Sequence, residues 1–145
     1  MLFFVSDAMA GGPSLSLNTF HAGFSTPTKQ DFNKGYIDED SRADVNALKI
    51  RIDGGDEGQS WKLYMRADSN MFSPGGYGKR FIDLKWKFDH ENSNSYRRVR
   101  INKQLIASGS GKTDVIKYID LRMMLDWSDP PANYKIGLTF TLEVE

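Results

Sequence analysis

The chain has 145 residues, which is enough for one domain with a single two-layer core. Its 19 Lys and Arg residues balance its 19 Asp and Glu residues, so no net charge draws the protein to nucleic acid or to an anionic membrane. It has no cysteine, which excludes disulfides and thiolate sites, and no apolar run approaches the roughly 20 residues that span a bilayer.

The first twenty residues form an apolar arm. Four consecutive apolar residues stand near its start and three more follow: Leu2, Phe3, Phe4, Val5, Leu15, Leu17 and Phe20. Ala8-Met9-Ala10 is like the cleavage site of a secretion signal, although the basic start and full apolar stretch of such a signal are missing. We therefore interpret residues 1–20 as an arm or signal remnant of an exported protein, and residues 21–145 as one domain.

Alternating apolar and polar residues recur along the chain, a pattern that places one face of a strand in a core and the other in water. Strands are predicted in chain order at residues 14–17, 48–52, 61–67, 82–88, 97–107, 115–125 and 134–145. Residues 21–44 lack periodicity and are interpreted as a long connection with short edge pairings. For residues 115–125 a short helix is the alternative, but the β-branched residues beside it favour a strand.

The last strand has the strongest signal. Six apolar residues share one of its faces: Tyr134, Ile136, Leu138, Phe140, Leu142 and Val144. One buried and one wet face are typical of antiparallel sheets, and no stretch has a helical apolar stripe. The sequence therefore predicts an all-β protein, an antiparallel β-sandwich of the Ig-like or jelly-roll kind with about seven strands. We expect its core to include Trp61, Leu63, Trp86, Phe88, Leu121, Leu138 and Phe140.

No sequence motif for catalysis is complete. Residues 109–113, Gly-Ser-Gly-Lys-Thr, resemble the end of a P-loop, but the motif needs a glycine where Ile106 stands and a following helix where a strand is predicted. His21 and His90 lie in separate polar segments, and no Gly-x-Ser-x-Gly nucleophile elbow is present. We expect no enzymatic activity and no cofactor.

Two acidic loops are candidates for calcium, which prefers carboxylate oxygens. Their residues are Asp38, Asp40, Asp53 and Asp56. Neither loop has the residue order of an EF-hand, so solvated turns are the favoured interpretation.

A cluster of basic residues follows the fourth predicted strand. It consists of Arg97, Arg98, Arg100 and Lys103. Because the chain has no excess of positive charge elsewhere, we interpret it as a solvated strand face and turn rather than as a phosphate-binding patch.

One layout resembles a known group of proteins. Residues 118–134 comprise a strand, a turn at Pro130-Pro131 and Tyr134, and they lead directly into the terminal strand. This resembles the end of secreted bacterial β-sandwich surface proteins, among them pilin-like subunits of the spore-coat-protein-U type, and Trp61-Lys62-Leu63 is similar to their Trp-x-Leu strand. This chain lacks the cysteines of those pilins. The resemblance implies an extracellular, non-enzymatic structural role, and some such proteins assemble by donating an N-terminal strand to the next subunit.

Two functions follow as hypotheses. The first is a structural or adhesive cell-surface subunit that self-associates, its apolar arm filling an incomplete sandwich in a neighbour. Gly11-Gly12-Pro13 favours this over packing on the arm's own sandwich, because the joint is flexible and Pro13 cannot continue a ladder. The alternative is a monomeric carbohydrate-binding module in which exposed aromatic rings stack on a surface glycan: Tyr64, Trp127 and Tyr134.

Overall fold

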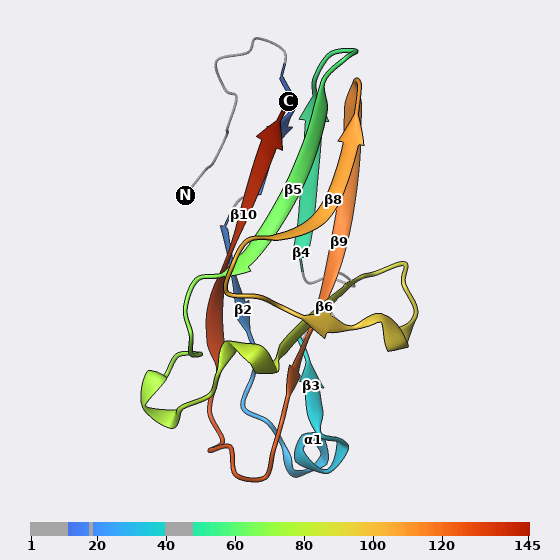
Figure 1. The fold of residues 1–145 in the computed structure, drawn as a ribbon. Helices are drawn as coiled ribbons and strands as arrows, with labels where there is room; N and C mark the ends of the chain where they lie inside the picture. Colours follow the sequence, from blue (N-terminus) through green and yellow to red (C-terminus); the bar gives the residue numbers. More distant parts are fainter. Residues whose placement is uncertain (1–11, 18, 40–47) are drawn as a thin grey trace.

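A computed structural model describes residues 12–17, 19–39 and 48–145. Two antiparallel sheets pack face to face, which confirms the predicted all-β sandwich (Figure 1). The first sheet has the order β1-β4-β9-β6-β7, with β3 also paired to β9. Its strands are β1 (Ser14–Leu15), β3 (Tyr36–Asp38), β4 (Leu48–Gly54), β6 (Leu84–Phe88), β7 (Arg97–Arg98) and β9 (Thr113–Met124).

The second sheet has the order β2-β10-β5-β8. Its strands are β2 (Thr19–Gly23), β5 (Ser60–Ala67), β8 (Gln104–Ser110) and β10 (Lys135–Val144). Four short helices lie in the connections: α1 (Lys29–Lys34) and the 3₁₀ turns η1 (Gly75–Tyr77), η2 (Phe81–Asp83) and η3 (Ser93–Ser95). The described residues form ten strands rather than the seven predicted, because β2 overlaps the presumed connection, β3 lies within it, and residues 97–107 divide into β7 and β8, one in each sheet.

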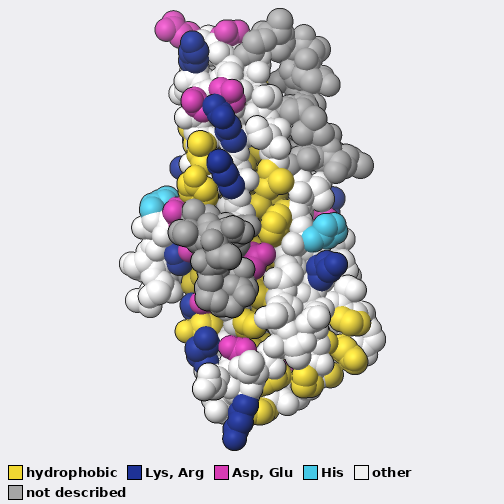
Figure 2. All heavy atoms as spheres, turned by 180° about the vertical axis from the view of Figure 1, so that it is seen from behind, with side chains coloured by type: hydrophobic (Ala, Val, Ile, Leu, Met, Phe, Trp, Pro, Cys, Tyr) yellow, Lys and Arg dark blue, Asp and Glu magenta, His cyan; other side chains and the backbone are white. Residues whose placement is uncertain are grey.

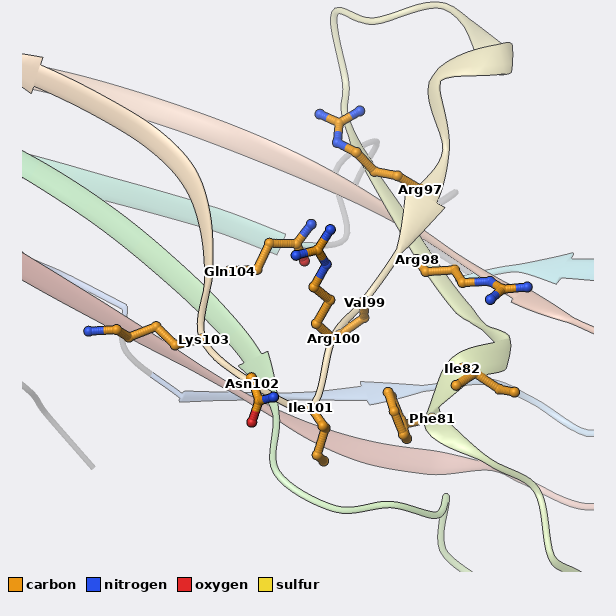
Figure 3. Close-up of a pocket in the computed structure, with 10 residues that line it drawn as sticks. All are labelled: Phe81, Ile82, Arg97, Arg98, Val99, Arg100, Ile101, Asn102, Lys103 and Gln104. Carbon is orange, nitrogen blue, oxygen red and sulfur yellow. The ribbon is translucent and has the colours of Figure 1, made fainter.

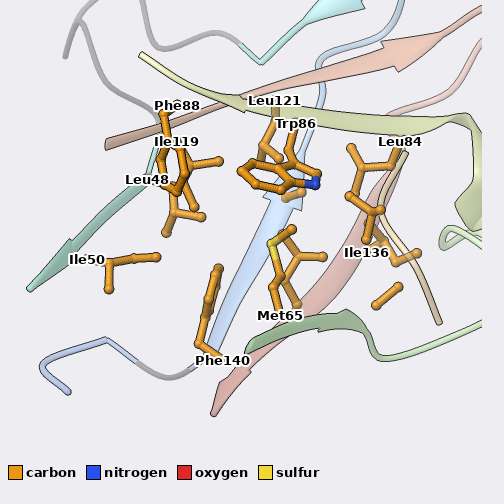
Figure 4. Close-up of a cluster of buried hydrophobic side chains, with 14 of the residues drawn as sticks. Leu48, Ile50, Met65, Leu84, Trp86, Phe88, Ile119, Leu121, Ile136 and Phe140 are labelled. Atoms are coloured by element: carbon orange, nitrogen blue, oxygen red, sulfur yellow. The ribbon is translucent and has the colours of Figure 1, made fainter. Parts of the chain in front are cut away.

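The core between the sheets is made by the inward faces of the alternating strands (Figure 4). All seven residues predicted to be buried are at most 8% exposed. Trp86 and Phe88 of β6 meet edge to face at 5.2 Å between ring centroids, opposite Phe140 and Met65 of the other sheet. The alternation in the sequence therefore gives the correct register for each of the long strands.

The described part of the arm packs on this chain's own sandwich. Leu15 pairs with Ile52 of β4 and is 4% exposed, and Phe20 pairs with Leu138 of β10 and is partly buried. Leu17 also packs against the core. The sandwich therefore begins at least as early as residue 14, before the predicted boundary at residue 21. Leu2, Phe3, Phe4 and Val5 lie outside the described residues.

Strand β9 changes partners along its length. Residues 113–119 pair with β4, while β6 covers the opposite side only from Ile119 to Met123. Between β7 and β8 the chain crosses from the first sheet to the second. Val99 N donates to Leu84 O of the first sheet (3.0 Å), and Ala67 N of the second sheet donates to Arg100 O (2.8 Å). The crossover covers one half of this side of the sandwich. The other half, beside residues 113–117, has no covering strand in the described structure.

Candidate functional site

The uncovered part of β9 exposes backbone hydrogen-bonding groups. Asp89 N donates to Tyr118 O (3.0 Å), so Tyr118 directs its peptide groups toward β6. Because residues of an antiparallel strand alternate in the side to which their N–H and C=O point, Asp114 and Ile116 direct theirs the same way. β6 ends at the pair Phe88–Ile119, so among the described residues no strand meets these groups.

Strand β8 presents a second open edge on the same side of the molecule. Ser60 exchanges two backbone hydrogen bonds with Glu145, at 3.0 and 2.8 Å, so the next residue of β5, Trp61, turns its peptide groups toward Gly109 of β8. By the same alternation, Ser108 and Ser110 point away from β5. β8 is the last strand of its sheet, and no described strand pairs with that side.

A groove of about 340 Å³ lies between these two edges, which are joined by the turn at Gly111-Lys112. We call it the strand groove. It is lined by Trp61, Ser108, Gly109, Ser110, Lys112, Thr113, Asp114, Val115 and Lys117. It therefore combines unpaired backbone with two apolar side chains, Trp61 and Val115, among polar ones, and unpaired strand edges can accept an added strand.

Residues 109–113, the P-loop-like segment, build this groove. A Cβ on Gly109 would lie 2.6 Å from Cζ2 of Trp61, so only glycine lets β8 pass over the indole. Trp61 Nε1 donates to Thr113 Oγ1 (3.0 Å), and Gly111 takes a φ of 75° in the turn. β9 follows directly as a strand, so no helix N-terminus is available for phosphate.

Exposed apolar side chains flank the two edges. Leu105 of β8 is 52% exposed and Ile116 of β9 is 41% exposed. Lys117 points inward, with Nζ 5.4 Å from the ring centre of Phe88. An inward lysine discourages indiscriminate strand pairing at an edge, so a partner at this position would be favoured if it brought a carboxylate.

The three aromatic residues predicted to stack on a glycan do not form a platform. Tyr134 is 0% exposed, because its ring packs on Phe72 at 6.1 Å and its hydroxyl donates to Pro130 O, so its prediction as a stacking residue was wrong. Trp127 is 63% exposed in the loop after β9, but its ring stacks on Phe32 of α1 at 5.1 Å. Tyr64 lies on the outer face of β5, with Lys103 Nζ 4.4 Å from its ring centre.

The calcium candidates do not converge. Asp38 is paired with Arg122 of β9 (2.7 Å), whereas Asp53 lies opposite Asp114, eight positions away along β9. At about 3.3 Å per residue these positions are roughly 26 Å apart. Asp56 lies in the turn after β4, and Asp40 lies outside the described residues. Within residues 12–17, 19–39 and 48–145, no group of three or more His, Asp or Glu side chains is placed to hold a metal ion.

A cluster of charges and tyrosines that the sequence analysis missed lies on the outer face of the first sheet. The Arg122 guanidinium lies between the rings of Tyr36 and Tyr96, at 3.8 and 4.1 Å, and binds Asp38. Burial, assisted by the charge of Asp38, raises the pKa of Tyr96 to about 12, so its hydroxyl stays protonated. Each charge here has a partner, which indicates a stabilising network. Basic and acidic side chains also alternate along the face shown in Figure 2.

Glu39 follows β3 and is mostly buried. Burial raises the pKa of its carboxyl to about 7, the hydrogen bond from Gly23 opposes this, and Asp120 adds to it. Neither histidine joins it in a catalytic group: His21 is exposed on β2, and His90 stacks on Phe88 at 5.8 Å. A carboxyl of this kind titrates near neutrality, but no nucleophile or base of the described chain is in hydrogen-bond contact with it.

Comparison of the chain with protein-family models, with curated proteins and with solved structures gives no match. Among the helices of the described residues, none has the length and hydrophobicity needed to cross a membrane.

Proposed function

We propose that this protein is a non-enzymatic structural or adhesive subunit, exported to the cell surface, that self-associates by strand addition. The observation that supports it best is the strand groove, where two open strand edges flank Trp61 and Val115. Each backbone hydrogen bond gained there contributes about 0.5–1.5 kcal/mol net. The export part of the proposal rests on the resemblance to secreted β-sandwich surface proteins, and it requires that residues 1–11 are retained after export, because they supply the donated strand.

The occupant in this proposal is the N-terminal segment of a second copy. Residues 14–15 and 19–23 already pair with this chain's own strands, so the donated segment comprises residues 1–11. In an extended strand, Phe3, Val5 and Asp7 share one face. If this segment lies parallel to β9, Val5 pairs with Val115 and Asp7 with Lys117. Asp7 then supplies the carboxylate that the inward-pointing Lys117 favours.

The test is the oligomeric state of the full chain, measured by light scattering over a range of concentrations and by negative-stain imaging. We expect oligomers or filaments that are lost on deletion of residues 1–11. Ile116→Pro should also abolish them, because it removes an N–H from the open edge and leaves the ladder with β4 intact. Ile116→Thr is the matched control, since it keeps the N–H and removes the exposed apolar side chain.

A charge exchange tests the register. Asp7→Lys and Lys117→Glu should each weaken assembly, and the double variant should restore it, because the pair of opposite charges is rebuilt. A full-length chain that is monomeric at every concentration would refute assembly by strand addition. Assembly that Ile116→Thr abolishes as fully as Ile116→Pro would point to apolar contact instead of backbone pairing.

The carbohydrate-binding alternative loses its proposed platform, because Tyr134 is buried and Trp127 and Tyr64 lie on separate elements.

A further inference from the structure

The crossover between β7 and β8 borders a second hollow, of about 630 Å³ (Figure 3). We call it the crossover hollow. Val99 and Ile101 of the crossover, with Phe81 and Ile82 beside it, supply apolar walls. Arginines, Lys103 and the amides of Asn102 and Gln104 complete the lining, in which there is no carboxylate among the described residues. A volume of this size is typical of small-molecule sites.

The basic residues that line the hollow differ in whether an acidic side chain pairs with them. Arg97 stacks on Trp86 (3.9 Å) and binds Glu91 (2.7 Å), and Lys103 binds Glu143. Arg98 and Arg100 are exposed, and neither has an ion-pair partner in the described part of the chain. Arg98 faces Lys85 across the ladder, and like charges in that position repel. Arg98 shares the outer face with Lys85 and points away from Arg100 in Figure 3, so Arg100 supplies the uncompensated guanidinium group beside the hollow.

The amides add a second kind of recognition. Oε1 of Gln104 is buried without a hydrogen-bond partner, and an unsatisfied buried acceptor is costly. In Figure 3 the side chains of Arg100 and Gln104 point toward one another from the two ends of the crossover. Rotation about the last torsion of Gln104, which is broad, would turn this oxygen to a donor in the hollow. Asn102, which is exposed, offers a further amide.

We propose that the crossover hollow binds an acidic sugar, a uronate unit of a polysaccharide. The carboxylate pairs with Arg100, whose planar fork suits two parallel hydrogen bonds to it. Sugar hydroxyls bond to the amides of Asn102 and Gln104, and the C–H face of the ring lies on Phe81 and Ile101. This site lies apart from the aromatic residues that the sequence suggested for glycan stacking, and it does not depend on assembly through the strand groove.

A nucleic acid fits the hollow less well. Its backbone carries one charge per nucleotide and is bound by stripes of cations, whereas one uncompensated guanidinium group of the described residues faces the hollow and the whole chain has no net charge. Base stacking would need free aromatic faces, and Phe81 is the single aromatic residue among the described residues that line the hollow.

The experiment is calorimetric titration of the full chain with oligogalacturonate, with neutral dextran of equal length, with dextran sulfate and with single-stranded DNA. We expect oligogalacturonate to bind best and Arg100→Gln to weaken it at least about tenfold, as the loss of charge-assisted hydrogen bonds does. Arg98→Gln is the matched control, because it removes the same charge from a side chain that points away from Arg100, and it should change affinity less than about twofold. The monomeric variant Ile116→Pro should bind as the parent chain does.

Gln104→Met provides a second readout, because it removes the unsatisfied acceptor while keeping the side chain's size. We expect weaker binding of oligogalacturonate with no loss of melting temperature. Four results would overturn the proposal: no binding of oligogalacturonate, equal binding of neutral dextran, tighter binding of dextran sulfate or DNA, or equal losses in Arg100→Gln and Arg98→Gln. Full binding by Gln104→Met would contradict the placement of the sugar beside that amide.

Discussion

Gly109 is the residue on which the shape of the strand groove depends. Its missing side chain lets β8 pass within van der Waals contact of Trp61, which is 3% exposed and anchored by its hydrogen bond to Thr113. The backbone there is ordinary strand, so space alone requires glycine, and no left-handed conformation is involved. Contact with Trp61 therefore explains one glycine of the P-loop-like segment, and the other, Gly111, allows the turn between β8 and β9.

We predict that Gly109→Ala lowers the free energy of unfolding by about 1–3 kcal/mol, the usual cost of overpacking. The added Cβ would lie 2.6 Å from the indole, so either Trp61 or β8 must move. Denaturant melts measure this, and Gly23→Ala is the control, because its Cβ would meet nothing within 4 Å. Equal stability of the two variants would show that β8 does not lie over Trp61 as described.

Among the elements, the long strands could be predicted from sequence and the short ones could not. β4, β5, β6, β9 and β10 each bury one face, so their alternation is visible in the residues themselves. β2 buries only Ala22, and its pairing with β10 depends on a partner more than 100 positions away. α1 had a local signal that the analysis did not use: Thr28 and Asp31 form a capping box, and Gly35 ends the helix at a φ of 89°.

The site was harder to predict than the fold, for a related reason. The strand groove exists because β6 ends at Phe88 while β9 continues in the other direction to Thr113, and strand lengths in different parts of the chain are not coupled in the sequence. The burial of Tyr134 was missed because its place at the start of an alternating run is compatible with either a wet end or a core position. Its ring contact with Phe72, which lies in a distant loop, places Tyr134 in the core.

The register of β10 gives the prediction at this scale. Phe140→Ala should lower the free energy of unfolding by about 3–5 kcal/mol, because the ring is fully buried between the sheets. Thr141→Ala, one position along on the outer face opposite Tyr64, should cost far less. Chemical denaturation of both variants checks this, and a loss below about 1 kcal/mol for Phe140→Ala would mean that the strand is shifted by one residue.

In the whole molecule, β1 and β2 close one side of the sandwich, while on the other side the crossover closes one half and the strand groove leaves the other half open. Its own arm, from residue 14 onward, supplies edge strands to both sheets. The open edges carry apolar side chains at Leu105 and Ile116, which a solitary protein would expose to water. Self-association through these edges is therefore the central claim.

Hydrogen–deuterium exchange of single amides, measured by NMR as a function of protein concentration, tests this claim most directly. The Ile116 and Asp114 amides point to the open side of β9, whereas those of Val115 and Lys117 point to β4 and serve as internal controls. We expect Ile116 and Asp114 to exchange rapidly in dilute protein and to become protected as concentration rises, while Val115 and Lys117 are protected throughout. Rapid exchange of Ile116 and Asp114 at every concentration, in a sample that still forms oligomers, would contradict strand addition at this edge.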